Sequence, residues 1–264
     1  MSFIEIFLLG IIQGLTEFFP VSSSGHLVLF QNLFGMQEPL LFVDIMLHVG
    51  TLLSLFIFLR REIWELLQGF GRLCFNPRKN ISGPKTKLIF GLAIASLPTA
   101  IIGYFFSAFF ESLFSSLRAV GAALLVTGGF LLLTRVAKEK KKAPFLHPVF
   151  IGILQGLAIV PGFSRSGLTI GGAILLGWKR SEAAQFSFLL SIPAILGAVF
   201  FQFTKIDVVS QAWLPLLVGT LTAAASGYFA LFYLVALINK GKFYSFSYYC
   251  FMAGFLTIIL SFLI

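Results

Sequence analysis

Long runs of apolar residues dominate the chain, and short polar breaks separate them. Six of these runs are long enough for a membrane-spanning helix, which needs about 20 mostly apolar residues. They cover residues 40–59, 86–108, 117–136, 183–203, 213–238 and 246–264. The pattern therefore predicts a chain that crosses a membrane six times through α-helices.

Two further apolar stretches, 3–34 and 147–178, are interrupted near the middle. The first contains Pro-Val-Ser-Ser-Ser-Gly-His at 20–26, and the second contains Pro-Gly-Phe-Ser-Arg-Ser-Gly at 161–167. Proline, glycine and serine end helices and leave backbone groups unpaired, which the hydrocarbon region tolerates only where protein or water surrounds them. We therefore expect each stretch to form two short helices around a re-entrant loop.

The two interrupted stretches are related to each other without gaps at an offset of 142 residues. Gly-Ile-Ile-Gln-Gly-Leu at 10–15 matches Gly-Ile-Leu-Gln-Gly-Leu at 152–157, and Ser-Ser-Ser-Gly at 22–25 matches Ser-Arg-Ser-Gly at 164–167. Eight of the 16 positions from 10 to 25 are identical. Because hydrophobicity alone does not select shared glutamine, glycine and serine positions, the pattern indicates an internal repeat.

Each half of the chain then contains one re-entrant hairpin followed by three full spans. A hairpin returns the chain to the side from which it entered, and three is an odd number, so the two halves have opposite topology. The expected fold is an all-α polytopic membrane protein built as an inverted-topology repeat. The chain forms a single membrane domain, 1–264, with repeats at about 1–136 and 147–264 and a basic cytoplasmic linker at 137–146.

The basic residues test this topology independently, because the cytoplasmic loops of membrane proteins are rich in lysine and arginine. If the 60–85 loop is cytoplasmic, 16 of the 19 basic residues lie inside and two, Arg118 and Lys205, lie outside. Both termini are then extracytoplasmic, and the remaining basic residue, Arg165, lies within the membrane. The inside residues are Arg60, Arg61, Arg72, Arg78, Lys79, Lys85, Lys87, Arg135, Lys138, Lys140, Lys141, Lys142, Lys179, Arg180, Lys240 and Lys242.

The composition agrees with a membrane protein rather than a soluble domain. Hydrophobic residues make up 58% of the chain and charged residues 11%, whereas soluble domains have about 45–50% apolar and about 25% charged residues. The net charge of +9 would favour nucleic-acid binding in a soluble protein. Here the basic residues lie in the short polar segments between apolar runs, where they set the orientation of the chain in the membrane. We therefore expect the lipid bilayer as a partner and no nucleic acid.

Ionisable side chains inside a membrane are costly and mark functional sites. In the first interrupted stretch, Gln13 and Glu17 are four residues apart and share one helix face that leads to three serines. Glu17 can act as an acid or as a metal ligand, and His26 adds a base that works near neutral pH. The serines can act as a nucleophile, as hydrogen-bond donors or as a helix cap, and a cap is the commonest of these roles. They are Ser22, Ser23 and Ser24.

The second interrupted stretch carries Arg165 at the start of an apolar helix. The planar guanidinium of arginine suits phosphate oxygens, and a helix N-terminus also favours an anion. The alternative is an Arg165–Glu17 ion pair that only locks the two hairpins together. The neighbouring residues that can contact an anion are Ser164, Ser166, Gly167 and Thr169.

The two hairpins differ in their chemistry. Ile159 stands near the position of the second half that matches Glu17, so the first hairpin is expected to carry acid–base chemistry and the second to clamp phosphate. Asp44 and His48 are four residues apart near the outer end of the first full span, where they line the entrance or form a hydrogen-bonded polar pair. A lipid-embedded pocket with these groups fits hydrolysis of a phosphate ester or anhydride on a lipid.

Two motifs in these hairpins resemble the signatures of a known family. Residues 13–27 (QGLTEFFPVSSSGHL) and 161–169 (PGFSRSGLT) resemble the two motifs of bacterial undecaprenyl-pyrophosphate phosphatase, the bacitracin-resistance family. The resemblance extends over essentially the whole chain and includes the repeat and the stretch from Asp44 through His48 to Thr51. It implies hydrolysis of undecaprenyl pyrophosphate to the monophosphate, which recycles the lipid carrier of peptidoglycan synthesis at the cytoplasmic (inner) membrane, and resistance to bacitracin.

The family also implies a divalent cation, Mg²⁺ or Ca²⁺, and a set of functional residues. Gln13 stands where some members have a glutamate, so Glu17 is the one carboxylate expected at the metal. The nucleophile is left open among His26, Ser23 and water, and His26 is the expected base where it does not attack phosphorus itself. The residues on which the resemblance places roles are Glu17, Ser23 and His26 in the first motif and Ser164, Arg165 and Thr169 in the second.

Two alternative functions have some support. Inverted repeats with broken helices are also transporter architecture, so the chain could flip a polyprenyl phosphate or carry another anion. The acid-phosphatase superfamily shares Ser-Gly-His and Ser-Arg segments, but Gly171 stands where a histidine is required and Leu175 where an aspartate is required. The oligomeric state is left open, with a homodimer as one arrangement.

Overall fold

The computed structural model describes residues 2–36, 40–75, 83–140, 146–203 and 213–263. Within these ranges the regular structure is helical throughout, without a β-strand. Five of the described helices are long and apolar enough to cross a membrane, or six if the bent pair α3 (Leu41–Phe58) and α4 (Arg60–Phe75) counts as one span. The all-α, multi-spanning fold expected from the hydrophobic pattern is therefore confirmed.

Each apolar run predicted to cross the membrane contains one main helix. Besides α3, these helices are α6 (Pro84–Phe105), α8 (Leu117–Leu133), α11 (Arg180–Phe203), α12 (Trp213–Asn239) and α13 (Phe246–Leu260). Short 3₁₀ turns follow α8 at Thr134–Val136 and precede α13 at Phe243–Ser245.

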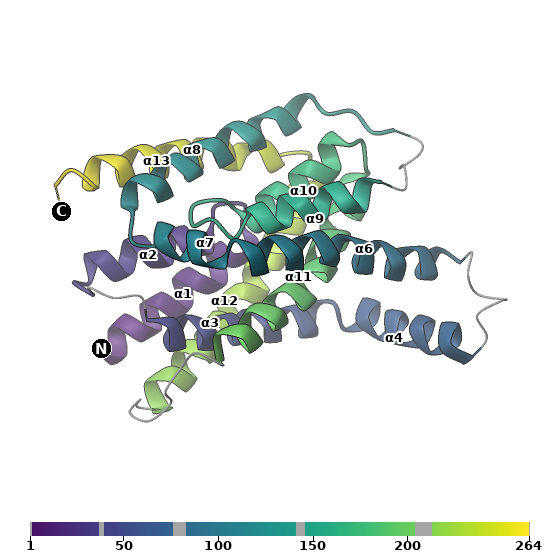
Figure 1. Ribbon diagram of the computed structural model, residues 1–264, viewed down its shortest axis with the longest axis horizontal. Helices are drawn as coiled ribbons and strands as arrows, with labels where there is room; N and C mark the ends of the chain where they lie inside the picture. The colour runs from purple at the N-terminus through teal and green to yellow at the C-terminus, as the bar shows by residue number, and fades with distance from the viewer. Residues whose placement is uncertain (1, 37–39, 76–82, 141–145, 204–212, 264) are drawn as a thin grey trace.

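Both interrupted stretches form two helices with a break between them. The first consists of α1 (Phe3–Phe18) and α2 (Ser23–Leu33), and the second of α9 (His147–Leu157) and α10 (Arg165–Leu175). Figure 1 shows that the chain turns back on itself at each break, so each stretch is a helical hairpin. The breaks lie within the predicted Pro/Gly/Ser segments or just before them.

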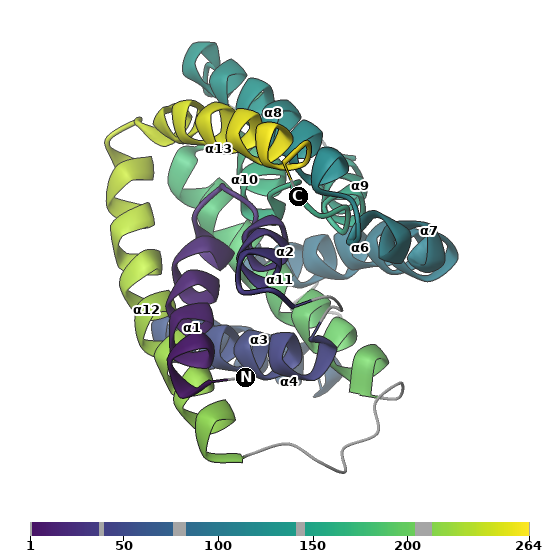
Figure 2. The same ribbon diagram turned by 90° about the vertical axis from the view of Figure 1, so that its left-hand side faces the viewer.

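The two hairpins approach each other from opposite ends of the molecule. In Figure 1, α1 starts at the end that holds both termini, whereas α9 starts at the other end. Figure 2 looks onto the end with the termini and shows α2 in the middle, with α3, α6, α8, α12 and α13 around it. The hairpin tips therefore meet in the interior of the molecule, enclosed by longer helices.

The first helix of each hairpin packs closely on a long helix of the other half. A methyl group on Gly10 of α1 would lie 2.6 Å from the Gly219 carbonyl oxygen of α12, and one on Gly152 of α9 would lie 2.1 Å from the Ala95 carbonyl oxygen of α6. Gly10 and Gly152 are equivalent positions of the repeat. Small residues at such contacts let helix backbones approach closely in a membrane, so the two halves are packed crosswise.

Hydroxyl groups reinforce both contacts in the same way. Thr99 Oγ1 of α6 donates to the carbonyl oxygen of Gly152 at 2.9 Å, and Ser226 Oγ of α12 donates to the carbonyl oxygen of Gly10 at 3.3 Å. These interhelical hydrogen bonds satisfy polar groups that hydrocarbon cannot satisfy.

The polar segment 60–85, predicted to connect the first two spans, contains a helix in its first part, α4. Its apolar residues Ile63 and Leu66 pack against the core, while Arg60 and Arg61 are exposed. This amphipathic helix is too short and too charged for a membrane span of its own. A second short helix, α7 (Ser107–Leu113), follows α6.

Part of the predicted charge segregation falls outside the described residues. This applies to five of the basic residues and to half of the predicted linker at 137–146, of which residues 141–145 lie outside the described ranges. The five basic residues are Arg78, Lys79, Lys141, Lys142 and Lys205.

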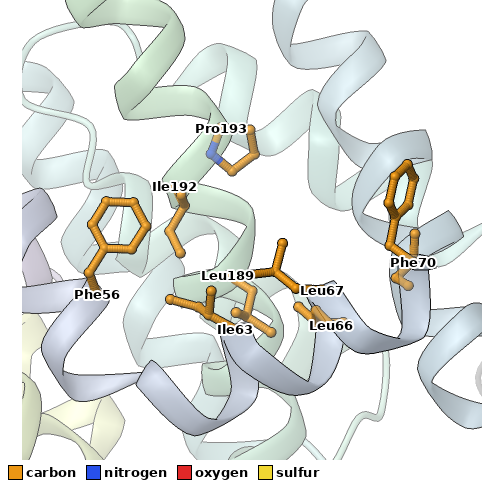
Figure 3. A pocket seen from close by; sticks show the side chains of 9 residues that line it. Phe56, Ile63, Leu66, Leu67, Phe70, Leu189, Ile192 and Pro193 are labelled. Atoms are coloured by element: carbon orange, nitrogen blue, oxygen red, sulfur yellow. The ribbon is translucent and has the colours of Figure 1, made fainter. Parts of the chain in front are cut away.

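A groove of about 240 Å³ lies between α3, α4, α6 and α11. Figure 3 shows aromatic and aliphatic side chains around it, including Phe56, Leu189 and Pro193. All nine lining residues are apolar, so the groove contributes no group that could hold or cleave a phosphate.

Substituting Gly152 tests the crosswise packing. Gly152→Ala places a methyl group against the Ala95 carbonyl oxygen, and overpacking of this kind costs about 1–3 kcal/mol. We expect a lower midpoint of thermal unfolding in detergent. Gly129→Ala in α8 is the matched control, because no atom lies within 4 Å of its added methyl group and alanine favours a helix by about 1 kcal/mol. Equal melting of the two variants would contradict the close contact.

Candidate active site

The tips of the two hairpins are joined at Ser22. Its hydroxyl accepts a hydrogen bond from the Gly25 backbone N–H at 3.2 Å, as the N-cap of α2, and another from the Gly162 backbone N–H at 3.0 Å. Gly25 and Gly162 also pack closely, since a methyl group on Gly25 would lie 3.1 Å from Gly162 Cα. Ser22 therefore serves as a cap and as a link between the two halves.

The second hairpin repeats this capping arrangement. Ser164 is the N-cap of α10, and its hydroxyl accepts from the Gly167 backbone N–H at 3.0 Å. Ser166 Oγ lies 3.2 Å from Ser164 Oγ and donates to the Phe19 carbonyl oxygen of the first hairpin at 3.2 Å. In the first hairpin Ser24 Oγ lies 3.3 Å from Ser22 Oγ. The repeated serines thus shape and connect the tips.

Glu17 lies at the centre of the polar contacts between the hairpins. Its side chain is buried, and Arg165 Nη2 donates to Oε1 at 2.6 Å. Ser23 Oγ donates to Oε2 at 2.6 Å, and Gln13 Nε2 donates to Oε2 at 3.0 Å. A buried carboxylate is stable only when it is paired and hydrogen-bonded, and these three donors meet that requirement. The structure thus brings Gln13, Glu17, Ser23 and Arg165 together.

Two polar atoms at this centre keep bonding capacity free. Arg165 Nη1 and Gln13 Oε1 are both buried without a hydrogen-bond partner among the described residues. Buried polar atoms are nearly always satisfied, and exceptions call for a functional reason. The ion pair expected as the alternative to phosphate binding is present, but it uses only one of the two terminal guanidinium nitrogens. The other nitrogen is available to an anion.

The oxygen atoms at this centre also suit a divalent cation that takes its remaining ligands from water or from the substrate. The Glu17 carboxylate and the free Gln13 Oε1 are oxygens of the kind that Mg²⁺ and Ca²⁺ prefer. Among the described residues no three His, Cys, Asp or Glu side chains form a metal cluster. A cation held here would therefore take most of its ligands from water and from phosphate, as Mg²⁺ commonly does.

His48 lies closer to the centre than an entrance position implies. Its Nε2 is 3.7 Å from Glu17 Oε2, and its Nδ1 lies 2.7 Å from the Asp44 carbonyl oxygen. The Asp44 carboxylate instead accepts from Gln31 Nε2 at 2.7 Å. The predicted polar pair is therefore split, with His48 directed to Glu17 and Asp44 to α2. Sequence reasoning missed Gln31, which has no motif around it.

Both ring nitrogens of His26 contact groups other than Glu17. Its Nδ1 lies 2.8 Å from the Ser22 carbonyl oxygen, and its Nε2 lies 2.6 Å from the hydroxyl of Tyr249 in α13. Tyr249 was not singled out from the sequence, because it lies in an apolar span 223 residues from His26 and outside both motifs.

Thr169 is buried in α10, one turn after Arg165. Its hydroxyl donates to the Arg165 carbonyl oxygen at 2.7 Å and lies 2.5 Å from the hydroxyl of Ser187 in α11. These contacts hold the first turn of α10 in place. The predicted contact of Thr169 with a substrate stays a prediction.

Comparison with known proteins agrees with the resemblance of the two motifs. Residues 6–256 match the family model of the bacitracin resistance protein BacA. The chain is 41% identical over 271 residues to a protein named undecaprenyl-diphosphatase from Halothermothrix orenii, with 99% of each chain covered. It is 42% identical over 270 residues to one from Carboxydothermus hydrogenoformans and 44% identical over 275 residues to one from Desulfosudis oleivorans, with 98% of each chain covered.

Removing the Ser22 hydroxyl tests the link between the hairpin tips. Ser22→Ala leaves the backbone N–H groups of Gly25 and Gly162 without their acceptor, and loss of a helix cap costs about 0.5–2 kcal/mol. We expect a measurably lower melting temperature in detergent. Ser24→Ala is the control, because the Ser24 hydroxyl is hydrogen-bonded to Ser22 Oγ and caps no helix. If Ser22→Ala melts no lower than Ser24→Ala, the link does not stabilise the fold.

Proposed function

The chain belongs to the family of the bacitracin resistance protein BacA, and on that premise we propose that it is an undecaprenyl-diphosphatase. It hydrolyses undecaprenyl pyrophosphate to undecaprenyl phosphate and inorganic phosphate, which recycles the lipid carrier of peptidoglycan synthesis and confers bacitracin resistance. The observation that carries this function is Arg165 at the meeting point of the hairpins. One of its terminal nitrogens pairs with Glu17, and the other is buried and free for a phosphate oxygen.

We propose that the fold is an inverted-topology repeat in the bacterial cytoplasmic membrane. The crosswise packing of Gly10 on α12 and of Gly152 on α6 supports this, because equivalent positions make equivalent contacts. The hairpins are then re-entrant, with α1 and α2 entering from the extracytoplasmic side, where both termini lie. The active site opens to that side.

The second hairpin is proposed to bind the pyrophosphate. Arg165 uses Nη2 to pair with Glu17, and its free Nη1 donates to a phosphate oxygen. Since α10 begins at Arg165, the positive end of its helix dipole lies next to the same anion. The further residues predicted to contact the substrate are kept in this proposal. These residues are Gln13, Ser22 and Ser24 in the first hairpin and Ser164, Ser166, Gly167 and Thr169 in the second.

Ser23 is proposed as the nucleophile. Its hydroxyl hydrogen points to Glu17 Oε2 across 2.6 Å, so the carboxylate can take the proton as the oxygen attacks the terminal phosphorus. The bond from that phosphorus to the bridging oxygen breaks, and undecaprenyl phosphate leaves. Water then hydrolyses the phosphoserine, releases inorganic phosphate and restores the Ser23 hydroxyl.

A divalent cation, Mg²⁺ or Ca²⁺, is proposed to be held by Glu17 and Gln13, and when bound it would neutralise charge on the phosphates. Arg165 and the helix terminus stabilise the same charge from the opposite hairpin. Positioning and charge neutralisation supply most of the catalysis in phosphoryl transfer. A transport function would need the anion contacts but not the Ser23–Glu17 pair, so the geometry and the named relatives favour hydrolysis.

Purified protein incubated with undecaprenyl pyrophosphate in detergent tests the function directly. We expect release of inorganic phosphate with Mg²⁺ or Ca²⁺, and a lower rate when a chelator removes the cation. Absence of released phosphate under every condition would make transport the better account.

Arg165→Lys tests the phosphate clamp in the same assay. Lysine keeps the positive charge but loses the two-nitrogen fork, so we expect the rate of hydrolysis to fall by about 10²-fold or more. Arg118→Lys is the matched control, because Arg118 stacks over the Phe262 ring at 4.5 Å and not on Glu17. Near-normal hydrolysis by Arg165→Lys would remove the clamp from the mechanism.

The two native cysteines test the proposed topology. Cys74 is exposed near the end of α4, on the side proposed as cytoplasmic, and Cys250 is buried in α13. A membrane-impermeant maleimide should therefore leave intact cells unlabelled and should label Cys74 in inverted membrane vesicles. Cys74→Ser is the control, because any label that this variant still takes up has reacted with Cys250. Labelling of Cys74 in intact cells would reverse the orientation.

A further inference from the structure

Both ring nitrogens of His26 are already in use. A carbonyl oxygen can only accept a hydrogen bond, so Nδ1, which lies 2.8 Å from the Ser22 carbonyl oxygen, carries the proton. The neutral ring then accepts through Nε2, and its donor is the Tyr249 hydroxyl at 2.6 Å. The two rings are also stacked, with centroids 5.7 Å apart and planes inclined by 13°. This arrangement fixes the position and the tautomer of the imidazole.

The hydrogen bond from His26 Nδ1 holds a strained residue. Ser22 has a φ of +69°, and it is the one non-glycine residue with positive φ in the described part of the chain. Such a conformation costs about 1–3 kcal/mol and persists only where several contacts enforce it. His26 holds the Ser22 carbonyl oxygen, while the N–H groups of Gly25 and Gly162 hold the hydroxyl.

The strained residue directly precedes Ser23. The 2.6 Å contact from Ser23 Oγ to Glu17 Oε2 therefore depends on the backbone that His26 and Ser22 fix. Tyr249 extends this chain of contacts to α13, so a helix of the second half supports the reactive serine of the first. His26 is 4% exposed and Tyr249 is 40% exposed, which places the tyrosine at the outer edge of the chain of contacts.

We propose that Tyr249 and His26 are positioning residues, which hold Ser22 in its strained conformation and thereby aim the Ser23 hydroxyl at Glu17. This inference rests on the proposed function. It departs from the expectation that His26 is the base or the nucleophile, because either role would require Nε2 to release Tyr249. The ring acts instead as a rigid link between α13 and the hairpin tip.

Tyr249→Phe is the first test, since it keeps the stacked ring and removes only the hydroxyl. Loss of one hydrogen bond of about 1 kcal/mol corresponds to a fall in kcat of about 5–10-fold. We expect KM and the melting temperature to stay close to wild type, because the substrate contacts and the packing are kept. Tyr248→Phe is the matched control, because the adjacent Tyr248 is 59% exposed and its change should leave kcat unaltered. An unchanged or raised kcat in Tyr249→Phe would overturn the proposal.

Substitutions of His26 separate positioning from chemistry. The amide nitrogen of asparagine can take the place of Nδ1 and still donate to the Ser22 carbonyl oxygen, whereas that of glutamine reaches the place of Nε2. We expect His26→Asn to retain kcat within about 10-fold of wild type, and His26→Ala and His26→Gln to lose about 10²-fold, the effect of a misplaced reacting group.

The pattern across the variants decides between the two roles. Equal and near-complete loss of activity in His26→Asn, His26→Gln and His26→Ala would overturn positioning and restore His26 as base or nucleophile. If His26→Ala does not fold, the comparison of asparagine with glutamine gives the same decision. Wild-type protein in the same assay distinguishes failure of this inference from failure of the proposed function. If the proposed function is wrong, the wild-type protein itself releases no phosphate.

Discussion

The ion pair between Glu17 and Arg165 is the interaction on which the arrangement of both hairpins depends. A carboxylate and a guanidinium taken out of water cost several kcal/mol each unless they are paired and hydrogen-bonded. Their 2.6 Å contact joins α1 to α10, and Gln13 and Ser23 complete the shell of the carboxylate. Loss of either partner would leave an uncompensated charge at membrane depth. The interaction that stabilises the tips is thus also the one that presents a free N–H to an anion.

The repeat separates scaffold from chemistry. Positions that are identical in the two halves carry structural contacts: Gly10 and Gly152 allow close helix packing, and Ser22 and Ser164 cap the second helix of each hairpin. One pair of positions that differ carries a hydroxyl in the first half and a guanidinium in the second. Ser23 and Arg165 are equivalent in the repeat, and each follows its capping serine. One backbone design therefore presents a hydroxyl from one side and a guanidinium from the other.

Hydrophobic run length predicted the spanning helices, and Pro/Gly/Ser breaks predicted both hairpins, because these signals are local. The motifs singled out Glu17, Ser23 and Arg165, which the structure brings into contact, and their roles in catalysis stay predictions. Sequence reasoning missed α4, because its charged and amphipathic pattern differs from that of a membrane span. It also missed Tyr249, because its contact with His26 joins residues 223 positions apart and an apolar span gives no sign of it. The local pattern places residues on helices, whereas long-range packing decides which of them meet.

The crosswise packing has a consequence for the time course of synthesis. Glu17 and Arg165 are 148 residues apart in the chain, and ribosomes add about 5–20 residues per second. The first hairpin therefore exists for about 7–30 s before its arginine partner is made, and the Gly219 contact of α1 is completed later still. During that interval the nascent carboxylate has to be hydrated, protonated or shielded by the insertion machinery. A charged hairpin can therefore precede its partner in the chain only if its charge is tolerated during membrane insertion as well as in the finished fold.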